Sequence, residues 1–407
     1  MADQRITETI EFKTQIHVGW DNTEQRMALR EHPRRNISYR YTGMSSRNSE
    51  YLRALCNGQQ TQQLEFPLWS ANRLLPQTRY EQQAHLQLTA RDMWDYRDCH
   101  AVMLMKKYDG INAISERFNL KSISANGFLQ TTKQFTSQWD ADSTIVVPVF
   151  WGILNQEDSY TNVTSQVADL CINVEFMPSI AAVELPETIN EYNYPRLTFE
   201  KSLNADTEYK GYELFMFPPS WYQDQNISYS RNANRLDNET GYFRFDLKSA
   251  ETTTTRVMDF YGLTKDEIHF LQRFFYRCKG QWKSFYMPSW TSDIKLAQDA
   301  LAGDNIIYGE FLYYYKYYSS NNRRKLIIVF FENGTVQIIE LAGWTVDKTG
   351  TMSKIYLKNN LKTNLLKDDI RMISFLCKVR HNSDIMTTQY ETNEAASISF
   401  EVKEVND

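Results

Sequence analysis

The sequence predicts a mainly β protein with two tandem β-barrel or sandwich domains, each carrying one helix. Three observations support this fold class: the length, the many aromatic residues and an internal repeat. The chain has 407 residues, of which 14% are aromatic, while glycine and proline number only 15 and 10. Because one domain usually has roughly 100–200 residues, this length favours two units. Tyr, Phe and Trp favour strands with large buried side chains.

Four blocks of the first half have counterparts in the second half, in the same order. The pairs are 18–43 with 234–262, 50–69 with 269–290, 101–118 with 325–342, and 146–176 with 371–405. Such a repeat predicts a tandem duplication. We expect a first domain at 1–178, a linker at 179–195, and a homologous second domain at 196–407. The second domain starts with an added segment, 211–234, that has no partner in the first copy.

The first pair of blocks begins with an Asp-Asn turn, at Asp21 in one copy and Asp237 in the other, followed by two strand-like runs. Further hairpin turns are expected at Asp109-Gly110 and Asn333-Gly334, because Asp-Gly and Asn-Gly between apolar runs are strong hairpin signals. Each turn is expected to join two antiparallel strands.

The second pair of blocks contains the helix of each domain. In the second copy Thr264 is the expected N-cap, and Glu267 completes a capping box. Gly280 is expected to end this helix. Its apolar face consists of Ile268, Leu271, Phe274 and Phe275. We therefore expect one amphipathic helix packed against the strands of its domain.

In the first copy we expect a shorter helix that starts at Ser46 or Ser49 and points Leu52 and Leu55 inward. A strand ending in Pro-x-Trp follows the helix in both copies and is expected to return beside it. The Pro-x-Trp residues are Pro67, Trp69, Pro288 and Trp290.

Charge and cysteine content restrict the possible functions. The 45 basic and 50 acidic residues give a net charge of −5, which argues against a protein that grips nucleic acid through its phosphates. The five cysteines form no Cys-x-x-Cys pair, so we expect free thiols in a reducing compartment. Neither a signal peptide nor an apolar stretch approaching the ~20 residues of a membrane span is found. We expect a soluble protein that is not exported through the Sec pathway.

The sequence contains no residue constellation typical of an enzyme. Its six histidines are scattered, and the common zinc, serine-hydrolase and nucleotide-binding motifs are missing. Adjacent acids occur at Glu157-Asp158 and Asp368-Asp369, but neighbouring strand residues point to opposite faces, so solvated loops are the better interpretation. We expect His269 to be packed. We predict no catalytic activity, no metal and no cofactor.

Two aromatic runs are candidate contact surfaces. Residues 30–41 mix basic and aromatic side chains, which indicates a surface strand or subunit contact in preference to a nucleic-acid site. Residues 311–318 hold five tyrosines and a phenylalanine. Such residues are enriched at protein interfaces, and packing in a core or edge strand is an equal alternative.

Several of these residues carry a resemblance to a known family. Residues 18–43 contain Asp21, Glu24, Gln25, Arg26, Pro33 and Arg34. Residues 270–293 combine a helix end, Gly280 and an aromatic strand closing at Pro288 and Trp290. Together they resemble tail-tip proteins of long-tailed bacteriophages and related gene-transfer agents, of the distal tail or baseplate hub type. The chain departs from the family pattern at Asn22 and Thr23, and its second copy keeps Asp237 but lacks the Glu-Gln-Arg run.

The resemblance implies a structural protein of the virion tail tip, assembled in the host cytoplasm, with tail-tube-like β domains. Its rings would continue the tail tube, contact other tube and tip proteins, connect to fibre or spike proteins, and let DNA pass only as cargo. Two copies per chain would let three chains form a pseudo-sixfold ring, with a hexamer of whole chains as the alternative. Insertion into a membrane is not expected.

A different class of function is a carbohydrate- or receptor-binding module at the tail tip. Exposed rings of Trp69, Trp221, Trp282 or Trp290 would then stack on sugars. The matching positions of Trp69 and Trp290 in the two copies favour a role in the fold. A cell-wall hydrolase would need clustered acids or a metal set, which the sequence does not show.

Overall fold

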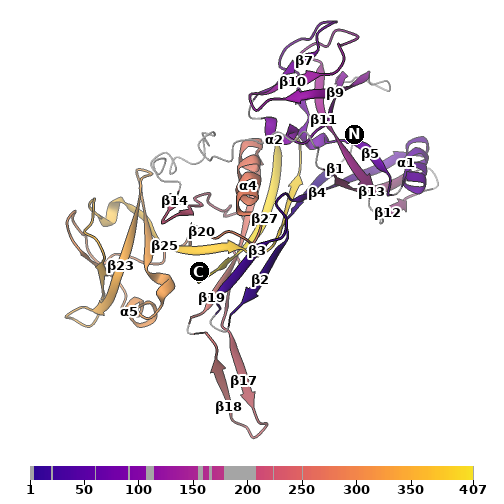
Figure 1. Ribbon diagram of the computed structural model, residues 1–407. Coiled ribbons are helices and arrows are strands. Elements are labelled where there is room, and N and C mark those ends of the chain that lie inside the picture. Colours follow the sequence, from indigo (N-terminus) through magenta and orange to yellow (C-terminus); the bar gives the residue numbers. More distant parts are fainter. Residues whose placement is uncertain are drawn as a thin grey trace.

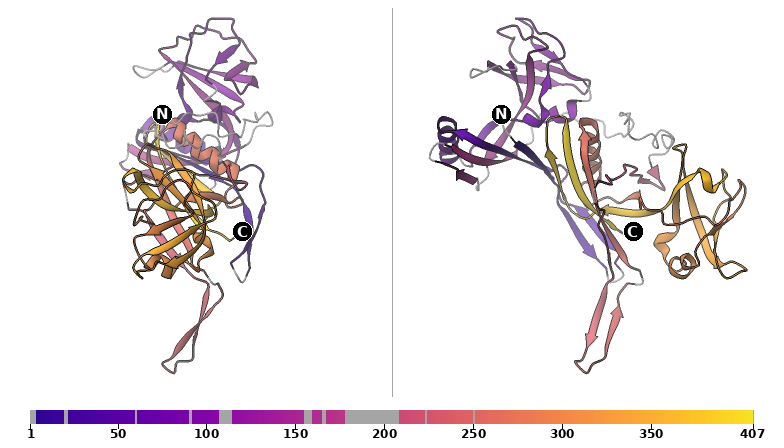
Figure 2. Two further views of the ribbon diagram at one scale, coloured as in Figure 1. Left: turned by 90° about the vertical axis from the view of Figure 1, so that its left-hand side faces the viewer. Right: turned by 180° about the vertical axis from the view of Figure 1, so that it is seen from behind.

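The computed structural model describes residues 4–19, 22–59, 61–89, 92–106, 114–154, 159–164, 167–177, 208–222, 224–249 and 251–406. The protein is mainly β, as predicted. Long strands form the centre of the molecule, and the β7–β10 and β21–β24 regions form two outlying lobes (Figures 1 and 2). The expected linker, 179–195, lies outside the described residues, so the domain boundaries stay predictions.

The elements of the first half are β1 (Gln4–Glu11), β2 (Thr14–Val18), β3 (Glu24–Ala28), β4 (Arg34–Ser45), α1 (Ser46–Gln59), β5 (Gln63–Pro67), β6 (Arg73–Leu74), β7 (His85–Gln87), α2 (Met93–Tyr96), β8 (Ala101–Lys106), β9 (Ser115–Ile123), β10 (Phe128–Thr131), β11 (Thr144–Leu154), β12 (Ser159–Asn162) and β13 (Val167–Phe176).

The elements of the second half are β14 (Glu208–Tyr209), β15 (Tyr212–Glu213), β16 (Ile227–Ser230), β17 (Ala233–Asp237), β18 (Phe243–Leu247), β19 (Thr253–Thr264), α4 (Lys265–Cys278), β20 (Phe285–Pro288), β21 (Ile306–Gly309), α5 (Tyr313–Tyr318), β22 (Leu326–Phe331), β23 (Val336–Val346), β24 (Ser353–Leu357), β25 (Ile370–His381), β26 (Ile385–Tyr390) and β27 (Ala395–Glu404).

The two halves use the same scheme of strand pairing. In the first half β4 pairs with β1 and β13, β13 pairs with β12 and β11, and β11 pairs with β5 and β8. In the second half β19 pairs with β16 and β27, β27 pairs with β26 and β25, and β25 pairs with β20 and β22. Each strand of one series therefore has a counterpart in the other.

The lengths of the elements and the spacing of equivalent residues agree with this correspondence between the two halves. Strands β4 and β19 both have 12 residues, and the helices that follow them, α1 and α4, both have 14. Near the end of β4 and of β19 the register shifts, and a glycine with φ of 61° lies at each shift, Gly43 and Gly262. From β1 to the end of α1, equivalent residues are thus 219 positions apart, the spacing from Gly43 to Gly262.

Helix α4 follows the sequence prediction closely. The backbone N–H of Thr264 donates to the Glu267 carboxylate at 2.7 Å, and the capping box is complete. The predicted apolar face is buried. The helix ends at Cys278, and Lys279 already adopts the left-handed conformation, with φ of 50°, one residue before Gly280. The expectation of a shorter first helix is wrong, because α1 continues through Cys56 and Gly58 to Gln59.

Other local expectations need correction. The turn at Asn333-Gly334 joins β22 and β23 as predicted, whereas Asp109-Gly110 lies outside the described residues. Each half has a second, short helix, α2 and α5, so one helix per domain was too few. The tyrosine-rich run forms α5 and not a strand, since Tyr314 and Tyr318, four positions apart, stack at 6.1 Å on one helical face.

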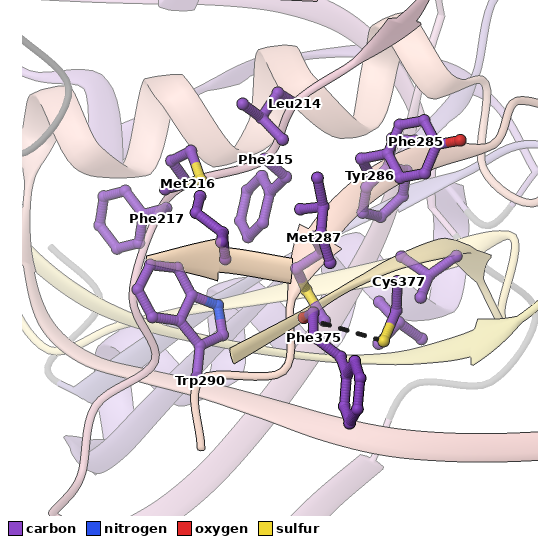
Figure 3. Packing of buried hydrophobic residues seen from close by; sticks show 14 of the residues in the cluster. Leu214, Phe215, Met216, Phe217, Phe285, Tyr286, Met287, Trp290, Phe375 and Cys377 are labelled. Carbon is purple, nitrogen blue, oxygen red and sulfur yellow. Dashed lines mark hydrogen bonds between the residues drawn. The ribbon is translucent and has the colours of Figure 1, made fainter. Parts of the chain in front are cut away.

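The added segment is shorter than predicted. Residues 227–230 form β16, which pairs with β19 as β1 pairs with β4. Among the described residues, the part without a counterpart is therefore 208–222. Its residues Leu214–Phe217 fill the space between α4 and β20 (Figure 3). Phe215 lies 4.6 Å from the ring of Phe274 and 6.0 Å from that of Phe285.

His381 lies among the aromatic rings of this second core, 4.8 Å from Phe400 and 5.0 Å from Phe275. Burial, aided by the nearby charge of Arg380, lowers its pKa from 6.5 to about 3. The unfolded state therefore binds the extra proton first, and stability falls as the pH drops below 6.5. We predict that His381 removes about 2 kcal/mol of unfolding free energy between pH 7 and pH 5.

The measurement is urea unfolding of the wild type and of His381→Leu at several pH values. The variant is expected to lose this part of the pH dependence, whatever its stability at pH 7. An unchanged slope in the variant would show that folding does not shift the pKa of His381.

Candidate subunit interface

The two halves meet edge to edge in one sheet. Strand β1 of the first half pairs with β26 of the second, from Ile6 opposite Tyr390 to Glu11 opposite Ile385. Because β1 also pairs with β4, the sheet runs without a break from one half to the other. Figure 1 shows the long strands of both halves side by side. We call the contacts around this pairing the internal junction.

A buried ion pair lies under the internal junction. The Arg35 guanidinium is 2.5 Å from the Glu8 carboxylate, and the Tyr390 hydroxyl donates to the same carboxylate at 2.8 Å. Gln272 of α4 donates to it at 3.2 Å. Burial alone would raise the pKa of Glu8, but the Arg35 charge and the Tyr390 hydrogen bond outweigh it and hold the pKa below 4.5. Removing either charge would leave the other buried without its partner.

A second buried cluster links α2 of the first half to α4 of the second. Asp95 lies 2.9 Å from the Lys265 ammonium and 3.1 Å from the His269 ring. The indole of Trp94 donates to Gln272 at 2.8 Å. Burial raises the pKa of Asp95, yet Lys265 and His269 hold it well below 3.8. His269 is packed, as expected, and α4 is covered here by the first half.

The β2–β3 hairpin extends the junction across the second half. Glu24 accepts from Arg380 at 2.6 and 2.9 Å and from Lys403 at 2.9 Å. Arg26 donates to Ser284 at 2.8 Å. Burial would raise the pKa of Glu24, but hydrogen bonds from the two basic groups lower it to about 2. The hairpin is held by charged contacts to β25 and β27.

The opposite edges of the two halves have no second strand partner among the described residues. Within the described residues, β12 pairs only with β13 and β16 only with β19, although their counterparts β26 and β1 each pair on both sides. Ile10 of β1 is 1% exposed, whereas Tyr229, which takes its place in β16, is 69% exposed. An unpaired edge with an exposed aromatic side chain is a site for strand addition.

Helix α1 is exposed on the face that corresponds to the buried face of α4. Glu50, Arg53 and Ala54 of α1 are exposed. Their counterparts in α4, 219 positions later, are His269, Gln272 and Arg273, which are all buried. Within the described residues the chain therefore contains one complete junction, and the counterparts of its two faces do not pair with each other.

The predicted motif residues lie in several separate parts of the structure. Glu24, Arg26 and Gly280 lie near one another, because Arg380 binds both Glu24 and Gln281, the neighbour of Gly280. Gln25 is exposed on β3, Pro33 precedes β4, and Arg34 forms an ion pair with Glu175 at 3.3 Å. Asp21 lies outside the described residues. Asp237 ends β17 and is the counterpart of Val18, so the alignment of the two Asp-Asn turns is wrong.

The Pro-x-Trp residues are equivalent in the two halves. Pro67 lies opposite Val149 of β11, and Pro288 lies opposite Leu376 of β25. Trp69 is half-buried and Trp290 is 7% exposed, whereas Trp221 is 62% exposed. The Trp290 ring is thus not available to stack on a sugar.

The buried groups of the junction escaped the sequence prediction. Glu8 stands between Ile6 and Ile10 on the inward face of β1, and an acid at an apolar strand position is a signal of a buried ion pair. Its partners Arg35, Gln272 and Tyr390 come from distant parts of the chain. No local pattern joins them.

No protein-family model matches this chain, and no curated protein matches it in sequence. Across the described ranges, no three His, Cys, Asp or Glu side chains gather in a group able to hold a metal ion. In the same part of the chain, none of the helices has the length and apolar character needed to cross a membrane.

Proposed function

We propose that this protein is a non-catalytic structural component of a bacteriophage tail tip or baseplate, which forms a ring that continues the tail tube. The observation that carries the proposal is the internal junction. One half binds the other through β1 and β26, and the chain also presents the counterparts of these edges, β16 and β12, without partners among the described residues.

The same contact repeated between chains gives a head-to-tail assembly. Strand β16 of one chain pairs with β12 of the next, while α1 is covered as α4 is covered in the internal junction. Such a heterologous contact closes into a ring when its rotation divides a full turn. Three chains then supply six equivalent β domains, and the resemblance to tail-tip proteins favours this number over a hexamer of whole chains.

Native mass spectrometry, with symmetry read from averaged particle images of the protein and of tails that carry it, tests the proposal. The expected assembly has three times the mass of the 48.0 kDa chain, or 144 kDa, with sixfold-like density at the tail tip. A stable monomer that is absent from every tail would contradict the function and favour a sugar-binding accessory role.

A further inference from the structure

The two halves carry equivalent hairpins with different surroundings. Hairpin β2–β3 pairs Thr14 with Ala28 and Val18 with Glu24. Hairpin β17–β18 pairs Ala233 with Leu247 and Asp237 with Phe243, and every one of these positions is 219 residues later. Each hairpin directly follows its edge strand, β1 or β16. The equivalence therefore predicts equivalent contacts.

Of the two hairpins, β2–β3 is the one that makes those contacts in the described part of the chain. Its inward face, with Glu24 and Arg26, lies on the second half and binds Arg380, Lys403 and Ser284. Hairpin β17–β18 instead extends away from the body in all views (Figures 1 and 2). All but the first of its strand residues are exposed.

The exposed face of β17–β18 is aromatic at the positions where β2–β3 is charged. Phe243 stands in the place of Glu24, Phe245 in the place of Arg26, and they are 53% and 58% exposed. Their rings lie 5.7 Å apart, edge to face. Two neighbouring exposed phenylalanines on a projecting hairpin are typical of a binding surface.

On the first half, the residue that corresponds to Arg380 is also apolar. In the first half, Ile153 lies four residues after Val149, which is opposite Pro67. In the second half, Arg380 lies four residues after Leu376, which is opposite Pro288. Ile153 is paired with Glu175 just as Arg380 is paired with Lys403. An aliphatic residue thus replaces the arginine that binds Glu24.

Two further apolar side chains share the face of this isoleucine, whose cross-strand neighbours are Gln63 and Glu175. Trp151, two residues earlier on the same face of β11, is exposed, and so is Met177, whose N–H donates to the Trp151 carbonyl at 2.8 Å. We call Trp151, Ile153 and Met177 the apolar strip. Its Ile153 matches the phenylalanines of the hairpin as Arg380 matches Glu24, while Glu175 takes the place of Lys403.

We propose that the aromatic face of the β17–β18 hairpin docks on the apolar strip of a second copy of this chain. The inference rests on the proposed ring function, because the neighbour that pairs its β12 with β16 also presents its apolar strip to the hairpin. At the positions of Glu24 and Arg380 the internal contact is ionic, whereas Phe243 and Ile153 make the contact between chains apolar at the equivalent positions. This difference keeps the two junctions of one chain distinct, since neither hairpin finds its complement at the other site.

The test uses the full chain and reads the dissociation of the ring by analytical ultracentrifugation. Phe243→Glu is expected to raise the dissociation constant at least about 30-fold, as loss of an interface hot spot does. Ile153→Arg alone is expected to weaken the ring as well. The double variant Phe243→Glu/Ile153→Arg recreates the Glu24–Arg380 pair and is expected to restore most of the affinity.

Leu236→Glu is the matched control, because Leu236 is exposed on the opposite face of the same hairpin. It is expected to leave the ring intact, and thermal unfolding of each variant verifies its fold. A ring of unchanged affinity in Phe243→Glu, or no recovery in the double variant, would overturn the docking while the proposed function stands. Failure of the wild type to form any ring would overturn both.

Discussion

Glu8→Ile is expected to destabilise the protein by about 3–5 kcal/mol, because it leaves the Arg35 guanidinium buried without its carboxylate. Glu8 and Arg35 are 1% and 8% exposed, and their charges are 2.5 Å apart. The Tyr390 hydroxyl and the Gln272 amide would lose an acceptor in the same step. The measurement is the free energy of unfolding in urea at pH 7.

The second half of the chain provides the matched control. Ile227 and Thr254 occupy the positions equivalent to Glu8 and Arg35, so an uncharged pair is compatible with this place in the fold. The double variant Glu8→Ile/Arg35→Thr is expected to recover at least half of the lost stability, since it removes the unpaired charge. If the double variant is as unstable as the single variant, the cost does not come from the guanidinium.

Tyr229→Asp is expected to prevent assembly without unfolding the chain. In the proposed ring Tyr229 enters the core of the neighbouring first half, as Ile10 enters the second core within the chain. An aspartate there would be buried without a partner, which costs several kcal/mol and raises the dissociation constant at least about 100-fold. Because Tyr229 is exposed in the single chain, the thermal unfolding of the variant is expected to stay nearly the same as that of the wild type.

Tyr80→Asp serves as the control for this prediction. Tyr80 is also exposed, but it lies in a turn of the first half, outside the edges β12 and β16. Its substitution is expected to leave the assembly intact. Sedimentation of both variants at several protein concentrations gives the comparison. If the two variants assemble equally well, β16 is not part of the interface.

The features predicted from sequence are those encoded locally. The capping box of Thr264 and Glu267 and the apolar face of α4 lie within one helix, and the turn at Gly334 lies within one hairpin. The Pro-x-Trp correspondence was also readable, because proline and tryptophan are rare enough to mark equivalent positions. The mainly β class followed from composition and alternation.

The features that were missed depend on pairing between distant segments. Strand β1 and its counterpart β16 share only an alternation of side chains, so the repeat that the sequence predicts begins too late in both copies. The Asp-Asn turns were aligned by residue identity, whereas the glycine bulges Gly43 and Gly262 set the true register. The Glu8–Arg35 pair depends on β1 lying between β4 and β26, which no local signal indicates.

A disulfide between chains tests the central claim most directly. Thr7 lies opposite Gln389 in the internal junction, and the equivalent residues at the open edges are Asn226 and Thr161. Opposite residues in antiparallel strands are close enough for a disulfide. We predict that Asn226→Cys/Thr161→Cys, on mild oxidation, gives covalent dimers and closed trimers that neither single variant forms. A stable assembly without this cross-link, or a chain that remains monomeric, would contradict the account.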